Sequence, residues 1–392
     1  MTRAGREDRL GWALAAGLAG YVLFATVDWR LPDAAGVPFG PAWAALAGAG
    51  VLGARFVRRR WEPLAALAIA AIAAALLTDL TQFWGQPLRD LGIYLKAGER
   101  FSAGASVYLS GLVTARPADL TDYPFLYPPP ALPAFALLAA LPRPLIEAGW
   151  LAGSVTAAVG GLRLLGLPWR WAVAALAWPP LLQGLYVGNV SVAAFALFAA
   201  APWFGAGLVL SAVLKPYAAV AGLWLVREGR FRQLLAGASA VAALGLVTLP
   251  IVGLDAWRTW VEGLRLYSAS QPLLPEYLYG LGLPRYVPSL AFAGLAAGAV
   301  AWAWLGRGRG GLARFGVATV VAAPSAFAHG FLVALPAFLG LRAAWLWLVL
   351  GITSVAPGVA WWLAILVAVA ASSLPGFRRE DGGGPWPAAP TR

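Results

Sequence analysis

The sequence predicts an all-α protein that crosses a membrane many times. Of its 392 residues, 60% are hydrophobic and only 12% are charged, whereas soluble domains carry about a quarter charged residues. The apolar residues form long runs separated by short loops that contain arginine, which is typical of transmembrane helices. Transmembrane barrels alternate apolar and polar residues, and these runs do not alternate. We therefore expect a polytopic helical protein with roughly 12 to 14 membrane segments, several of them shorter than a full span.

Charge and residue counts limit the classes of partner and cofactor. The net charge is +12, but the arginines lie at the ends of apolar runs, as the positive-inside bias requires. We therefore expect membrane lipids as partners and no nucleic acid. The chain contains no cysteine and one histidine, which excludes thiolate metal sites and multi-histidine metal or haem centres. We expect no metal and no cofactor.

The N-terminal arginines place the start of the chain in the cytoplasm. Three spans follow, over about 10–27, 41–57 and 63–83. We expect residues 1–61 to form an N-terminal pair of transmembrane helices and residues 62–375 to form the core. Because the second span ends in a cluster of arginines, the segment after the third span lies on the extracytoplasmic side.

That segment, 84–127, is the longest polar interruption in the chain. The spacing of Asp90, Tyr94 and Ala97 places them on one face of a short interfacial helix. A partly desolvated Asp90 would suit a general base that faces a sugar hydroxyl. The alternative is an interfacial anchor, with Asp90 paired to Arg89 or Arg100.

The remaining runs predict further membrane segments as far as residue 373. We expect them over about 128–141, 145–162, 171–187, 190–204, 206–226, 233–251, 287–305, 343–356 and 358–373. The stretch 315–341 predicts either two short helices or one kinked pair. A second outer loop is expected over about 252–286. The Gly- and Pro-rich tail, 376–392, is expected to be a disordered cytoplasmic segment.

Four residues in or beside the apolar runs are candidates for function. Lys215 lies in the middle of a run and precedes Pro216, which predicts a helix break and an anchor for a lipid phosphate; snorkelling to an interface is the alternative. His329 is either a packing residue or a donor to a phosphate or sugar hydroxyl. Asn189 is a polar break between two spans, with the same two alternatives. Tyr127 re-enters the membrane ahead of a run of prolines and belongs to the aromatic belt or to a pocket wall.

Four motifs give the chain a resemblance to glycosyltransferase family 87, within the GT-C superfamily of membrane glycosyltransferases. They are D-L-x-x-Y-x-x-A with a later G-x-x-x-Y (Asp90, Leu91, Tyr94, Ala97, Gly104, Tyr108), Y-P-P (Tyr127, Pro128, Pro129), Lys-Pro before a basic loop (Lys215, Pro216, 227–232), and Pro-Ser with a later His and Leu-Pro (Pro324, Ser325, His329, Leu335, Pro336). The chain departs from the family where Gly188, Asn189, Val190 and Ser191 replace Gly-Gln-x-Asn, and where Gly330 follows His329.

The resemblance implies a GT-C-like fold and a polyprenyl-phosphate-linked sugar, mannose in the related enzymes, as donor. It implies that Asp90 is the catalytic base and that an acceptor hydroxyl of a glycolipid or glycan attacks with inversion at the sugar. The leaving phosphate would be held by Lys215 and by Arg89 or Arg100, without a metal. His329 would assist at the phosphate or the acceptor. Tyr94, Tyr127 and Asn189 would line the substrate site.

The same features place the protein in the plasma membrane, with both termini in the cytoplasm and the active site outside. A transporter or lipid flippase is the alternative from another class, and it predicts repeats and polar residues spread across the bilayer midplane. Here the polar residues gather toward one outer face, which favours an enzyme. An acyltransferase and an oligosaccharide ligase are the other enzymatic readings.

Overall fold

The computed structural model describes residues 87–114, 123–176, 178–273, 280–353, 359 and 361–374. These residues form α-helices, short 3-10 helices and loops, and they contain no β-strand. The predicted all-α class is therefore confirmed. The expected N-terminal pair of helices and the C-terminal tail lie outside the described residues.

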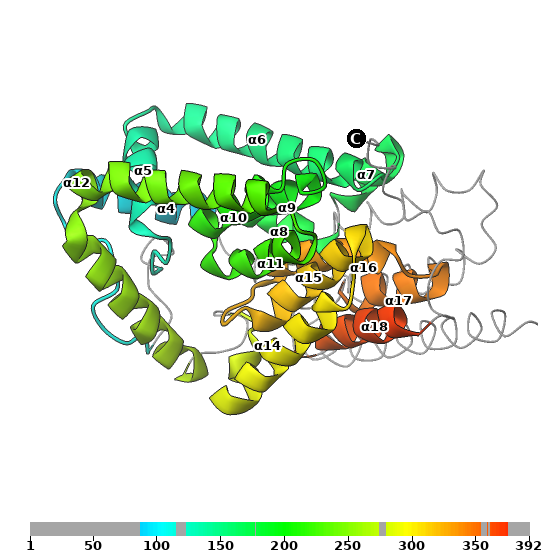
Figure 1. Cartoon of the computed structure of the whole chain (residues 1–392). Helices are drawn as coiled ribbons and strands as arrows, with labels where there is room; N and C mark the ends of the chain where they lie inside the picture. The colour runs from blue at the N-terminus through cyan, green and yellow to red at the C-terminus, as the bar shows by residue number, and fades with distance from the viewer. Residues whose placement is uncertain are drawn as a thin grey trace, which may run out of the picture.

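The elements follow one another closely along the chain (Figure 1). In order they are α4 (Arg89–Ser102), η3 (Pro129–Ala131), α5 (Leu132–Ala139), α6 (Arg143–Leu164), α7 (Trp169–Ala175), α8 (Pro179–Val187), α9 (Ser191–Ala200), α10 (Ala206–Leu214), η4 (Pro216–Ala218), α11 (Ala219–Arg227), α12 (Phe231–Ser270), η5 (Gln271–Leu273), η6 (Leu283–Arg285), α14 (Ser289–Trp304), α15 (Gly308–Ala322), η7 (Ala328–Ala334), α16 (Leu335–Leu339), α17 (Ala343–Ile352) and α18 (Trp361–Ser373).

The largest apolar core joins α8 and α9 to the C-terminal helices α15 to α18. Its large side chains include Phe195, Phe331 and Trp361, none of which is exposed. A second core packs α4 against α5 and the segment that precedes it. A Cβ at Gly98 would overlap the carbonyl of Phe135, so the glycine allows these two helices to lie close together. The two cores place α4 beside the α8–α9 turn.

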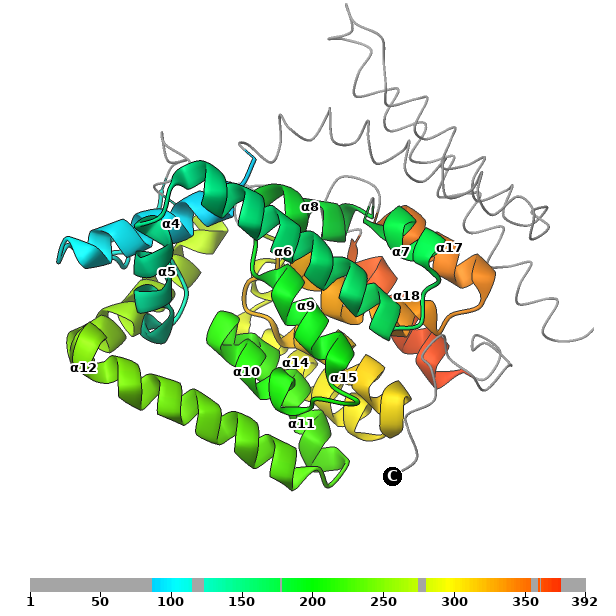
Figure 2. The same cartoon turned by 90° about the horizontal axis from the view of Figure 1, so that it is seen from above.

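Helix α12 differs from the expectation of a span that ends at 251 and a loop over 252–286. The helix continues to Ser270 and turns at Gly253, whose φ of 75° and ψ of 161° lie outside the helical region. Its first half runs along one edge of the molecule, and its second half leaves that edge at the turn (Figures 1 and 2). The helix contacts η3 and α5. Trp260 packs this second half against the cluster of α4 and α5, and Tyr267 packs it against side chains of the segments 109–113 and 123–126.

Two other expected spans are interrupted. The run 171–187 was expected to be one span, but it falls into α7 and α8, because a pair of prolines starts a new helix at Pro179. The run 206–226 is broken between α10 and η4, where Lys215 is extended with φ −146° and ψ 107°. Pro216 predicted this break. For 315–341, α15 is followed by the separate η7 and α16, with His329 at the start of η7.

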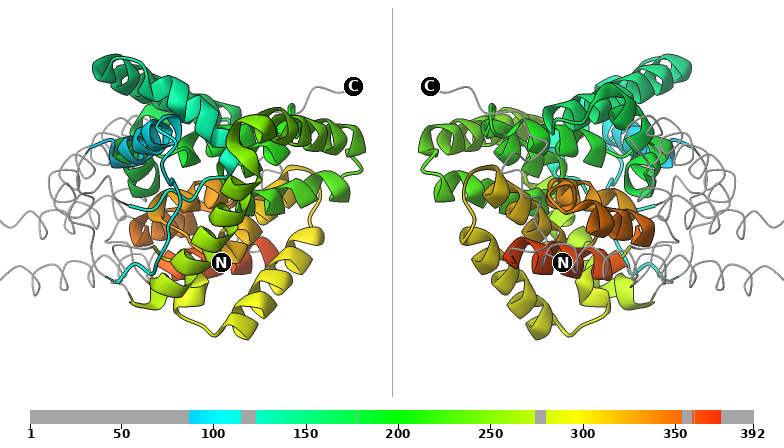
Figure 3. Two further views of the ribbon diagram at one scale, coloured as in Figure 1. Left: turned by 90° about the vertical axis from the view of Figure 1, so that its left-hand side faces the viewer. Right: turned by 90° about the vertical axis from the view of Figure 1, so that its right-hand side faces the viewer.

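The described part of the chain contains two helices that are long and apolar enough to cross a membrane, Arg143–Leu164 and Phe231–Leu273. The other apolar helices of 10 to 17 residues in this part are shorter than a span. Short helices are tolerated at membrane depth when they are buried in protein. Figure 3 shows the described helices from the two ends of the molecule. The structure is that of an all-α membrane protein, and the number of spans stays a prediction.

Candidate active site

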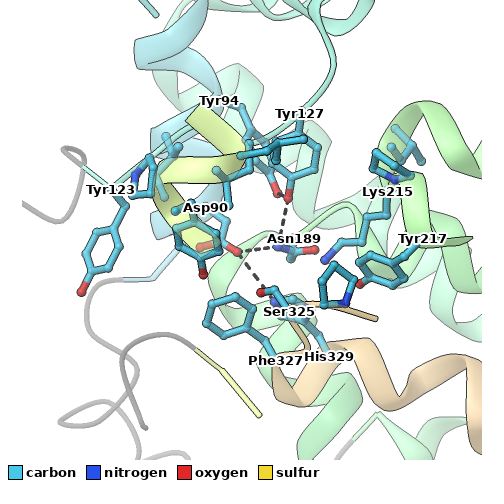
Figure 4. A pocket seen from close by; sticks show the side chains of 18 of the residues that line it. Asp90, Tyr94, Tyr123, Tyr127, Asn189, Lys215, Tyr217, Ser325, Phe327 and His329 are labelled. Carbon is cyan, nitrogen blue, oxygen red and sulfur yellow. Dashed lines mark hydrogen bonds and ion pairs between the residues drawn. The ribbon is translucent and has the colours of Figure 1, made fainter. Parts of the chain in front are cut away.

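A cavity of about 220 Å³ lies where α4, the α8–α9 turn, the α10–η4 break, the second half of α12 and the segment before η7 meet. Its lining is largely aromatic and polar and is shown in part in Figure 4. The lining includes Arg89, Asp90, Tyr94, Tyr123, Tyr127, Asn189, Lys215, Tyr217, Gln271, Ser325, Phe327 and His329. No single element could form this site.

Asp90 is held in the first turn of α4. The backbone N–H of Leu88 donates to the carbonyl of Tyr186 at 2.7 Å, which fixes the start of α4 against the end of α8. Asp90 is 7% exposed. Its Oδ1 accepts a hydrogen bond from Arg89 Nε at 3.0 Å, and its Oδ2 accepts one from Asn189 Nδ2 at 2.6 Å. Both oxygens thus have a donor, and the helix N-terminus also stabilises negative charge there.

Asn189 reaches Asp90 because α8 ends in a tight turn. Gly188 caps the helix with φ 71°, a conformation that glycine adopts without strain. The next residue, Asn189, then points its amide away from the helix axis and into the cavity (Figure 4). The backbone N–H of Ser191 donates to Asn189 Oδ1 at 2.8 Å. This contact identifies the oxygen, so the amide nitrogen faces the carboxylate.

Two tyrosines form the wall above the carboxylate. The hydroxyls of Tyr94 and Tyr127 are 2.7 Å apart, and Asn189 Nδ2 lies 3.4 Å from Tyr127 Oη. Burial raises the pKa of Tyr94 and of Tyr127 well above the usual tyrosine value. Both hydroxyls therefore stay neutral and serve as hydrogen-bond donors and acceptors at physiological pH.

Lys215 enters the cavity from the break between α10 and η4 (Figure 4). Its Nζ lies 5.8 Å from the centre of the Tyr217 ring, a cation–π contact. Within the described residues the structure records no ion pair for this ammonium. A bound anion would supply such an ion pair.

His329 lines the same cavity and is 3% exposed. Its Nε2 lies 4.0 Å from Asp90 Oδ2. Its Nδ1 lies 3.0 Å from Ser191 Oγ, and its backbone N–H donates to Gln183 Oε1 at 3.1 Å. Ser191 therefore holds one ring nitrogen, Gln183 holds the backbone, and the other ring nitrogen faces the carboxylate.

Seven of the eight residues that the sequence singles out line this cavity: Arg89, Asp90, Tyr94, Tyr127, Asn189, Lys215 and His329. Arg100 does not. It lies exposed in the last turn of α4, about 15 Å along the helix from Asp90 by the helical rise. The spacing that buries Asp90 and Tyr94 turns Arg100 outward.

Sequence reasoning missed Ser191, Gln183 and Tyr217. Tyr217 follows the Lys-Pro pair directly, so its place beside Lys215 could have identified it as a residue of the site. Ser191 and Gln183 flank Asn189, and only their contacts with His329 give them a role. Among the residues that the structure describes, no group of three or more His, Cys, Asp or Glu side chains could hold a metal ion.

The family model described as glycosyltransferase family 87 matches residues 125–321. Comparisons with the curated proteins and with the solved structures found no match. The matched segment includes Tyr127, Asn189 and Lys215, whereas Asp90 precedes it and His329 follows it. The cavity therefore joins side chains from inside and outside the matched segment.

Proposed function

This chain belongs to glycosyltransferase family 87, and we propose that it transfers a sugar from a polyprenyl phosphate to a hydroxyl group of a glycolipid or glycan. The resemblance of its motifs to those of mannosyltransferases makes mannose the proposed sugar. The observation that carries the proposal is a buried carboxylate, Asp90, in the same cavity as the ammonium of Lys215. Membership in a family of glycosyltransferases favours this function over that of a transporter or flippase.

In the proposed reaction the acceptor oxygen attacks the anomeric carbon of the donor sugar. The new C–O bond forms as the bond between that carbon and the phosphate oxygen breaks, and the phosphate leaves with the electron pair. Asp90 takes the proton of the acceptor hydroxyl, which makes the attacking oxygen more nucleophilic. Attack from the face opposite the phosphate inverts the anomeric centre. Its geometry supports Asp90 as the base, because Arg89 and Asn189 hold the carboxylate still.

The negative charge that develops on the leaving phosphate needs fixed donors. Lys215 and Arg89 line the cavity from different elements and supply two positive charges. Arg89 also contacts the Tyr123 ring, with its Cζ 5.3 Å from the ring centre, which orients the guanidinium. With these cations at the phosphate, the proposed reaction requires no metal. Arg100 has no place in this mechanism.

The cavity is proposed to face the extracytoplasmic side of the plasma membrane, with both termini in the cytoplasm. Apolar side chains of the lining, among them Ile93, Leu214 and Leu264, suit the lipid end of such a donor. A lipid-linked donor would enter from the bilayer, and the cavity is lined in part by the apolar helices α10 and α12.

The test is a transfer assay on the full chain in membranes that supply the acceptors. Radiolabelled mannose is offered either as polyprenyl-phosphate-mannose or as a nucleotide-linked sugar, each with and without EDTA. We expect transfer from the lipid donor alone, unchanged by EDTA, with inverted configuration in the product. Transfer from the nucleotide sugar alone, or its loss in EDTA, would overturn the donor or the metal-independent mechanism.

A further inference from the structure

Four side chains at the wall of the cavity lie in a ring that has three hydrogen-bond contacts and one longer gap. Asn189 Nδ2 donates to Asp90 Oδ2 at 2.6 Å, and Ser191 Oγ lies 2.7 Å from Asn189 Oδ1. Ser191 Oγ also lies 3.0 Å from His329 Nδ1, and His329 Nε2 closes the ring 4.0 Å from Asp90 Oδ2. All four residues are at least nine-tenths buried. Solvent therefore does not compete for these contacts.

The positions of the protons in this ring follow from the donor capacity of each atom. Asn189 Oδ1 carries no proton, so its short contact with Ser191 Oγ must use the one hydroxyl proton of Ser191. The serine then has no proton to give to His329. The contact between Ser191 Oγ and His329 Nδ1 is a hydrogen bond only if Nδ1 carries a proton.

The second ring nitrogen can then be identified. A positively charged imidazole would also carry a proton on Nε2, but 4.0 Å to Asp90 is too long for a direct hydrogen bond. The cations Arg89 and Lys215 line the same cavity and disfavour a third positive charge there. Gln183, which faces the backbone of His329, is neutral. The neutral ring with a lone pair on Nε2 satisfies all of these contacts.

We propose that Ser191 is a positioning residue: it holds His329 as the Nδ1–H tautomer, so that Nε2 presents a hydrogen-bond acceptor to the cavity beside Asp90. The distance of 4.0 Å between Nε2 and Asp90 Oδ2 is less than twice the usual hydrogen-bond distance of about 2.8 Å. One oxygen atom can therefore contact both. A position between two acceptors favours a hydroxyl, which has a proton to donate, over an oxygen of a phosphate, which has none.

The role of this acceptor atom in the reaction rests on the proposed function. Of the two roles considered for His329, at the phosphate or at the acceptor hydroxyl, an unprotonated Nε2 favours the second. The histidine serves the acceptor hydroxyl, and Lys215 serves the phosphate. Before attack the hydroxyl donates its one proton either to Nε2 or to Asp90, so the histidine offers the acceptor a second docking geometry beside the base. During attack the proton moves to Asp90, as in the mechanism above.

The test uses the fact that His329 is the only histidine in the chain. Incorporating ¹⁵N-labelled histidine into the full chain in lipid gives signals from one imidazole. A protonated and an unprotonated ring nitrogen resonate at well-separated frequencies. We expect Nδ1 protonated and Nε2 unprotonated in the wild type. The opposite tautomer, or a ring protonated on both nitrogens, would overturn the proposal.

Ser191→Ala is the variant that tests the cause. It removes the acceptor for Nδ1–H, and we expect the signals to change to those of the Nε2–H tautomer or of a mixture. Ser211→Ala is the matched control, because Ser211 is also a buried serine but its hydroxyl donates to the carbonyl of Leu208. Signals unchanged in Ser191→Ala would overturn the role of Ser191. The measurement needs no sugar donor, so its result is independent of the assay for transfer.

Discussion

Arg89 and Lys215 are both cations of the cavity, but their surroundings differ. Arg89 Nε is bonded to the Asp90 carboxylate at 3.0 Å, so part of its charge is already balanced. Lys215 contacts the Tyr217 ring, and no ion pair is recorded for it within the described residues. The Asp90 carboxylate in the same cavity is already paired with Arg89, so a bound anion is the partner that would balance the ammonium directly. Lys215 is therefore the residue that we expect to contribute most to phosphate binding.

Replacing Lys215 by methionine tests this expectation, because methionine keeps the length of the side chain and removes the charge. Hydrogen bonds to charged groups contribute about 1.5–3 kcal/mol, which corresponds to a fall of about 10- to 100-fold in kcat/KM for the lipid donor. Lys96→Met is the control, since Lys96 is a half-buried lysine of α4 that does not line the cavity. Equal kinetics for the two variants would show that Lys215 does not bind the phosphate.

At the scale of elements, the end of α8 positions both Asn189 and the first turn of α4, which carries Asp90. Gly188 directs Asn189 toward Asp90, and its carbonyl accepts a hydrogen bond from Trp150 Nε1 at 2.9 Å. A Cβ at this position would lie 3.1 to 3.3 Å from atoms of Leu88, Leu91 and Trp150. The first turn of α4 therefore rests directly on this glycine.

Gly188→Ala is expected to displace the start of α4 and so to lower the transfer rate. A left-handed backbone at a residue other than glycine also costs about 1–2 kcal/mol of stability. Gly229→Ala is a matched control, because Gly229 has a φ of 67° but open space around its Cβ position. Thermal unfolding in detergent should show a loss of stability in both variants, and the transfer assay should show a loss in Gly188→Ala only. Equal activities would contradict the coupling between α8 and α4.

Local patterns in the sequence predicted the elements that depend on local chemistry. The spacing of Asp90, Tyr94 and Ala97 predicted the buried face of α4, and Pro216 predicted the break after α10. The second half of α12 was missed, although Trp257 and Trp260 recur at helical spacing within it. Its charged residues suggested a loop, but they occupy only the exposed face of that helix.

At the scale of the whole molecule, the first half of α12 has the length of a membrane span. Its first half rises about 33 Å between the basic loop at 227–232 and the turn at Gly253, a length close to the thickness of the hydrocarbon core. Val252, at the upper end, packs in the same apolar cluster as α4 and α5. The basic loop and the apolar cluster of α4 and α5 therefore lie at opposite ends of the first half of α12, whose course is visible in Figure 2.

This arrangement predicts opposite labelling of two single-cysteine variants, which are simple to make because the chain has no cysteine. Glu99→Cys lies exposed in the last turn of α4, and Arg232→Cys lies exposed at the start of α12. We expect an impermeant maleimide to label Glu99→Cys in intact cells and to label Arg232→Cys only after permeabilisation. The reverse pattern would invert the proposed topology.

The assembly of the site is the part that the sequence alone could not predict. Asn189 and Asp90 are separated by 99 positions, and Ser191 and His329 by 138, yet each pair is within hydrogen-bond distance. Such contacts depend on how helices pack, which residue patterns along one helix do not encode. The candidate residues and the breaks or helix faces on which they lie could be inferred from the sequence, whereas the contacts that join them required the tertiary structure.

The central claim is that Asp90 accepts the proton of the acceptor hydroxyl. The most direct measurement is sugar transfer from polyprenyl-phosphate-mannose by Asp90→Asn, which keeps the size of the side chain and removes the basic oxygen. Asp255→Asn is the matched control, since Asp255 is exposed on α12 and pairs with Arg258. A general base contributes about 100- to 10,000-fold to rate, so we predict a loss of that order in kcat for Asp90→Asn and wild-type kcat for Asp255→Asn. Wild-type kcat in Asp90→Asn would contradict the account, because Asp90 would then serve only to anchor α4.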